Sequence, residues 1–74
     1  MPRTGAQLKL SGKRTRRARD RLGYSLVMVA EEAGVAEGTA LRAEHEKEIR
    51  PSSARKIAAA LGVGVADLIE EDGE

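Results

Sequence analysis

The chain has 74 residues, with 13 Lys and Arg against 12 Asp and Glu, and a formal net charge of +1. This length predicts one domain, and the absence of Cys excludes disulfides, thiolate metal sites and a Cys nucleophile. Because no apolar run reaches 18 residues and cysteine is absent, we expect no membrane span and a protein of the reducing cytoplasm.

The first ten residues are predicted to be a flexible N-terminal arm (residues 1–10), because Pro2 and Gly5 disfavour an early helix. Leu8 and Leu10 alternate with a lysine. This pattern leaves open whether they form a short strand or lead into the first helix.

A first helix is predicted over residues 12–22, with Ser11 as its N-cap and Gly23 as its end. At about 100° per residue, one helix face is predicted to hold three residues that pack together. They are Thr15, Ala18 and Leu22. Arg19 lies at the edge of this face and therefore needs a partner. Residues 1–21 carry eight Lys and Arg but one acidic residue, which indicates either a surface for polyanions or a solvated basic helix.

A second helix is predicted after the N-cap Ser25, and Gly34 is expected to end it in the left-handed conformation. Tyr24 and Val29 have the spacing of a hydrophobic staple. The stretch from residue 26 to 29 is apolar on nearly all sides, so part of it must be exposed or covered by a partner.

A third helix is predicted from residue 36 or 37 to residue 45, with Ala40 and Ala43 facing inward. The outward face then holds Gly38, Leu41, Arg42 and His45, with Glu37 at its margin. His45 has two possible roles: it contacts phosphate, or it interacts with the negative end of the helix.

The last third of the chain is predicted to be helical after a charged loop at residues 46–51. Ser52 is expected to cap a helix over 53–61, and a short helix follows over 65–70. The buried residues of the longer helix are predicted to be Ala54, Ile57, Ala58 and Leu61. The globular domain therefore spans 11–70, is all-α, and is followed by an acidic tail at 71–74.

The second and third helices have the spacing of a helix-turn-helix. Ala30 is the small residue where the helices meet, and Gly34 is the turn residue that tolerates positive φ. The inward apolar positions are Val29, Ala33, Val35, Ala40 and Ala43. Four motifs, AxxAGV, TxxRxE, RPS and KIAAALGV, stand in this order at residues 30–35, 39–44, 50–52 and 56–63. In these motifs the chain resembles the phage repressor/Cro-type (Xre-like) helix-turn-helix family.

This resemblance implies a compact five-helix, lambda-repressor-like domain with a central helix-turn-helix. It also implies a repressor-like, sequence-specific regulator of transcription that places its third helix in the major groove of double-stranded DNA. A homodimer is expected on half-sites about 34–36 Å apart, with its interface around residues 63–69. No cofactor, small-molecule ligand or membrane partner is expected.

The resemblance also implies roles for individual residues. Arg19 is expected to pair with Glu44, the residue that closes the third helix. The base-reading positions would be Glu37, Gly38, Leu41 and Arg42, of which Arg42 fits guanine most clearly. The expected phosphate contacts are the helix start at Ser25 and Leu26, the loop and cap at Lys47, Arg50 and Ser52, and the long-range charges of Arg14 and Arg17.

The sequence departs from the family pattern at several positions, and these departures count against the expected DNA contacts. Leu26 replaces a polar residue, Ala36 replaces a Ser or Thr cap, and Glu46 replaces a glycine. Glu46 and Glu48 also bring negative charge close to the DNA backbone. Ala40 and Ala43 stand where bulkier residues are usual. The apolar residues 26–28 and the acidic residues around the third helix motivate an alternative, a protein–protein interaction module, adaptor or antirepressor-like, on the same scaffold. No enzyme is expected, because no acid–base or nucleophile pair is present. No metal site is expected, because His45 is the single His.

Overall fold

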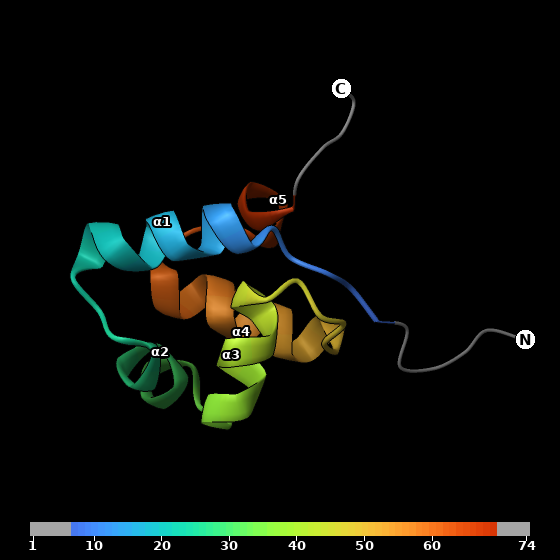
Figure 1. Ribbon diagram of the computed structural model, residues 1–74, viewed down its shortest axis with the longest axis horizontal. Coiled ribbons are helices and arrows are strands. Elements are labelled where there is room, and N and C mark those ends of the chain that lie inside the picture. The colour runs from blue at the N-terminus through green and yellow to red at the C-terminus, as the bar shows by residue number, and fades with distance from the viewer. Residues whose placement is uncertain (1–6, 70–74) are drawn as a thin grey trace, which may run out of the picture.

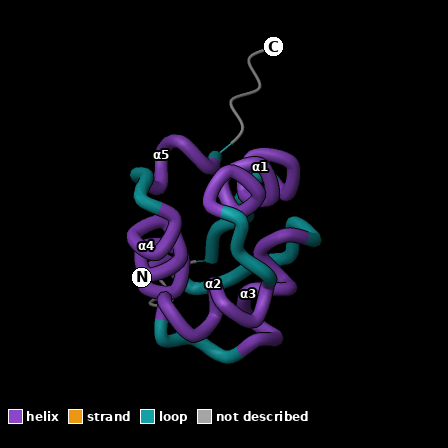
Figure 2. Tube along the Cα trace, turned by 90° about the vertical axis from the view of Figure 1, so that its left-hand side faces the viewer, coloured by secondary structure: helices purple, strands orange, loops and turns teal. Residues whose placement is uncertain are grey.

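A computed structural model describes residues 7–69 of the chain. Within this range the helices are α1 (Gly12–Leu22), α2 (Leu26–Ala33), α3 (Glu37–Glu44), α4 (Pro51–Leu61) and α5 (Val65–Leu68). Helices α1 and α5 lie at one end of the molecule and α2 and α3 at the other, with α4 between them (Figure 1 and Figure 2). The prediction of an all-α, five-helix fold is confirmed. None of the helices in the described range is long and apolar enough to cross a membrane.

Side-chain caps and glycines define the ends of α1 and α2, as predicted. The Ser11 hydroxyl accepts the Arg14 N–H at 3.1 Å, and the Ser25 hydroxyl accepts the Met28 N–H at 3.1 Å. Gly34 ends α2 with φ of +73°, a conformation that costs glycine little because it has no Cβ.

The core is built from small and medium-sized side chains of all five helices. The predicted buried face of α4 is confirmed, and Val29, Ala40 and Ala43 of the helix-turn-helix are buried. Ala33 and Val35 are half-buried and pack against this core. The prediction that Leu22 packs with Thr15 and Ala18 is wrong, because Leu22 is 45% exposed. Leu22 is the last residue of α1, whose end extends past α4 (Figure 1).

The segment before α1 packs on the domain through residues that the helical patterns did not identify. Leu8 and Ile49 form an isolated antiparallel bridge. The Leu8 nitrogen lies 2.8 Å from the Ile49 carbonyl oxygen, and the Ile49 nitrogen lies 2.9 Å from the Leu8 carbonyl oxygen. Leu10 is 1% exposed and Ile49 is 4% exposed. The last residues of the predicted arm are therefore part of the packed domain, and its first six residues lie outside the described range. The loop at residues 46–51, predicted only as charged, contributes a core residue.

Two predicted helix boundaries are wrong. Helix α4 begins at Pro51 with Arg50 as its N-cap, so Ser52 lies inside the first turn and does not cap it. Proline suits the first helical position, where no N–H partner is needed. Helix α5 ends at Leu68, whose carbonyl accepts the Ser11 N–H at 2.7 Å, and Ile69 is extended. Glu70 and the acidic tail at 71–74 lie outside the described residues.

Candidate nucleic-acid interface

Helices α2 and α3 form a helix-turn-helix whose outer face is open to solvent. The N–H groups of Gly34 and Val35 both donate to the Ala30 carbonyl, at 2.9 and 3.0 Å, which closes the turn. Ala30 is 4% exposed, and because its side chain is small the backbones of α2 and α3 can approach closely. The exposed residues on the outer side of α3 include Glu37, Gly38, Leu41 and Arg42. These are the four positions predicted to read bases, and they share one surface.

An ion pair fixes α3 against α1. The Arg19 Nε and Nη2 atoms donate to the two carboxylate oxygens of Glu44, with Nη2 to Oε1 at 3.0 Å, and Nη1 donates to the Tyr24 carbonyl at 3.0 Å. The Glu44 side chain is only 6% exposed. Its hydrogen bond raises the pKa of Arg19, against the lowering effect of burial. The pairing expected from the family pattern is therefore present, and it holds the end of α3 against α1.

A second contact between α1 and the end of α3 involves Glu46. This residue has φ of +58°, a conformation that a non-glycine residue rarely adopts. Its Oε2 accepts the Gly12 N–H at 2.9 Å, at the positive end of α1. A Cβ on Gly12 would lie 2.3 Å from the Glu44 carbonyl oxygen. The Glu46 carboxylate, expected to bring negative charge near DNA, is instead engaged by α1.

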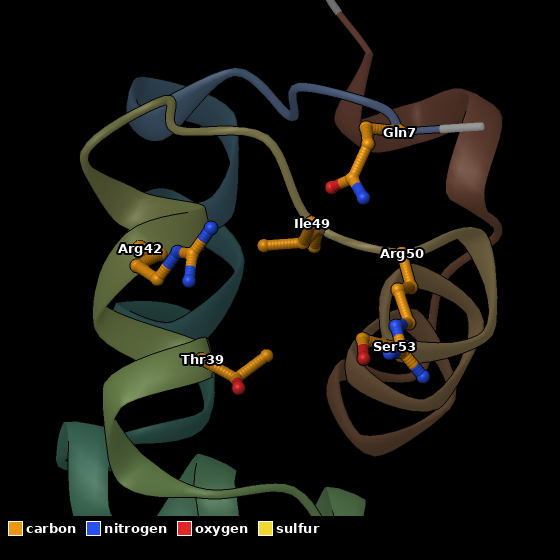
Figure 3. A pocket seen from close by; sticks show the side chains of 6 residues that line it. All are labelled: Gln7, Thr39, Arg42, Ile49, Arg50 and Ser53. Carbon is orange, nitrogen blue, oxygen red and sulfur yellow. The ribbon is translucent and has the colours of Figure 1, made fainter. Parts of the chain in front are cut away.

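A polar hollow of about 370 Å³ lies beside α3. Thr39 and Arg42 project from α3 toward Arg50 and Ser53 at the start of α4, and Ile49 lies between them (Figure 3). Gln7 completes the lining. The Arg42 Nη2 atom donates to the Glu48 carbonyl at 2.9 Å. Two guanidinium groups and two hydroxyl groups therefore line one open hollow, next to a helix start that has no side-chain cap.

The structure brings only some of the predicted phosphate residues onto this side. Arg50 lines the hollow, Ser52 is exposed in the first turn of α4, and Lys47 is exposed in the preceding loop. Ser25 is exposed at the start of α2, where Leu26 is half-buried. Arg14 and Arg17 instead line a different hollow with residues of α5, a helix that lies away from α3 in Figure 2.

Sequence reasoning missed Gln7, Thr39 and Ser53, which line the hollow. No periodic pattern marks them, since they come from three segments. The sequence placed Ser53 in the first turn of the fourth helix, but no local signal indicated that it lines a hollow together with Thr39. No cluster of three His, Cys, Asp or Glu side chains suited to a metal occurs within residues 7–69.

Comparison with known proteins supports the assignment of this architecture. Residues 16–68 match a helix-turn-helix family model. The N-terminal DNA-binding domain of SinR from Bacillus subtilis is 35% identical and superposes with a TM-score of 0.70, over 85% of this chain and 94% of that domain. A SinR–SinI protein complex contains a chain that is 34% identical, with a TM-score of 0.71, over 84% of this chain and 62% of that one. Comparison with curated protein sequences finds no match. The chain belongs to the Xre-type, lambda-repressor-like helix-turn-helix family.

Proposed function

We propose that this protein is a sequence-specific DNA-binding regulator of transcription, repressor-like in action, that reads the major groove with α3. One observation carries the proposal: the exposed outer face of α3 is continuous with the arginine-lined hollow at the start of α4. A recognition helix needs such flanking cations, because phosphate contacts fix its position while its own side chains read base edges. The similarity to the SinR DNA-binding domain supports the same function.

Arg42 is the proposed principal base reader. A guanidinium can donate two hydrogen bonds to guanine O6 and N7, which is worth about 1–3 kcal/mol of discrimination. In the free protein this group donates to the Glu48 carbonyl, so reading guanine requires it to exchange that exposed contact for the base. Leu41 would pack on a thymine methyl group, Gly38 would allow a close backbone approach, and Glu37 would accept from cytosine N4.

Phosphates are proposed to bind at two helix starts. At α4, Arg50 supplies a charge and Ser52 a hydroxyl, and the N-cap Arg50 forms no side-chain bond to the first-turn N–H groups. The neighbouring Lys47 adds a second charge. At α2, the backbone N–H groups near Ser25 and Leu26 would also bind a phosphate, here without a charged side chain.

Titration of duplex DNA at two salt concentrations tests this proposal. We expect binding to a random-sequence duplex at low salt that weakens steeply as salt rises, because each neutralised phosphate releases counterions. Duplexes enriched from a random pool should share a guanine, and Arg42→Ala should reduce their affinity by about 5–150-fold. Arg50→Ala should weaken all sequences alike and reduce the salt dependence.

Arg21→Ala is the matched control for this titration. Arg21 is exposed in the last turn of α1 and lines the hollow shared with α5, so its removal should leave binding nearly unchanged. Absence of binding at low salt would contradict the function. If Arg42→Ala lowered the affinity for every duplex sequence by the same factor, Arg42 would bind phosphate and would not read a base.

A homodimer on a two-fold operator is proposed as the working form. Val63, Val65 and Ile69 are half-buried around α5, which leaves apolar surface for a second copy. Two protomers per selected duplex, on half-sites about 34–36 Å apart, are expected in the same titration.

The alternative function is a protein-interaction module. Val27 and Met28 are each 43% exposed on α2, and Leu22 is 45% exposed nearby in sequence. Apolar side chains of this kind often mark an interface. The SinR–SinI complex shows that a related chain occurs with a protein partner. Failure of DNA binding at low salt would favour this alternative.

A further inference from the structure

We propose that three arginines of α1 form a docking surface for the chain's own acidic segment, residues 70–74. Arg14, Arg17 and Arg21 are named here the arginine stripe. They recur three and four residues apart, so they lie on one side of the helix. The acidic segment contains four carboxylates and no basic residue, and follows Ile69 directly.

The arginine stripe borders a hollow of about 490 Å³ that it shares with Val63, Asp67 and Leu68. Within residues 7–69 none of its three side chains forms an ion pair. The one carboxylate in the hollow, Asp67, already accepts the Gly64 N–H at 3.0 Å. In the part of the chain that the structure describes, this cationic hollow therefore holds no carboxylate within ion-pair distance of the stripe.

The chain leaves the described domain at this surface. The Arg14 Nη1 atom donates to the Ile69 carbonyl at 3.3 Å, so the last described residue lies beside the first arginine of the stripe. Arg14 and Arg21 are seven residues apart, which corresponds to about 10 Å along a helix. Five extended residues span up to about 18 Å. The acidic segment is long enough to run along the whole stripe.

The position of the stripe favours this occupant over DNA. Arg16 and Arg19, on the other flank of α1, contact Glu44 of α3, whereas the stripe faces α5. In Figure 2, α3 lies away from α5, so a duplex seated on α3 would not reach the hollow that the stripe shares with α5. A carboxylate segment attached at Ile69 also has a high effective concentration at the stripe. Neutralising the stripe would leave the hollow beside α3 as the main cationic surface.

Arginine side-chain NMR tests the proposal without DNA. At low salt, the Nε–H resonances of the stripe should differ between the wild type and a quadruple variant. In this variant Glu70, Glu71, Asp72 and Glu74 are replaced by Gln or Asn. High salt should produce the same shifts in the wild type, because it screens exposed ion pairs. The resonance of Arg19, which is held by Glu44, should not move.

Matched double variants separate this contact from a general effect of charge. E70Q/E71Q should move the stripe resonances, whereas E31Q/E32Q on the exposed side of α2 should not. Unchanged stripe resonances in the quadruple variant would overturn the proposal. The proposal would also be overturned if the difference between the wild type and the quadruple variant disappeared on dilution. That result would place the segment on a second copy of the chain.

Discussion

Replacing Arg19 by Ala is expected to destabilise the domain by about 2–4 kcal/mol, because it leaves the Glu44 carboxylate buried without its main partner. The Glu44 side chain is 6% exposed, and the neighbouring Arg16 reaches it only at 3.7 Å. At about 4–8 °C per kcal/mol for a domain of this size, the melting temperature should fall by at least about 8 °C.

Arg16→Ala is the matched control for this prediction. The Arg16 side chain is 59% exposed, so its contribution is that of a surface ion pair, about 0–1 kcal/mol. Thermal unfolding followed by circular dichroism measures both variants. Similar melting temperatures for the two would contradict the central role of the Arg19–Glu44 pair in joining α1 to α3.

Gly12→Ala is expected to cost about 2–3 kcal/mol, because overpacking of a tight contact forces the backbone to shift. The added Cβ would lie 2.3 Å from the Glu44 carbonyl oxygen, a backbone atom that cannot rotate away. The same shift would strain the bond from the Gly12 N–H to Glu46. Chemical denaturation should show a lower midpoint.

Gly38→Ala provides the comparison, because no atom outside its own helix lies within 4 Å of its Cβ position. Alanine there should leave stability unchanged or raise it by up to about 1 kcal/mol. If Gly12→Ala were as stable as Gly38→Ala, α1 and the end of α3 would not be in the close contact described.

The sequence predicted the parts of the fold that depend on local patterns. Ser11 and Ser25 as caps, and Gly23 and Gly34 as helix ends, are read from single positions with a clear backbone reason. The helix-turn-helix follows from the spacing of Ala30 and Gly34 relative to the apolar positions. The pairing of Arg19 with Glu44 was accessible because both lie beside a core face and because the family pattern links them.

Features that depend on contacts between distant segments were not predictable in this way. Leu10 and Ile49 are isolated apolar residues in segments without periodicity, and they become core residues through the bridge at Leu8. The hollow beside α3 likewise joins side chains from three segments. Glu46 looked like an unfavourable charge near DNA because nothing local indicates its bond to Gly12.

The most direct test of the account is to map DNA binding onto the backbone amides by NMR with a short duplex. Two regions are expected to shift: the helix-turn-helix from Ser25 to Glu44, and the stretch from Lys47 to Ser53 at the start of α4. With a duplex that carries one half-site, and therefore binds one protomer, the amides of α1 from Arg14 to Arg21 and those of α5 should remain largely unchanged. Shifts centred on α1 and α5, with α3 unaffected, would contradict the proposal that α3 reads DNA.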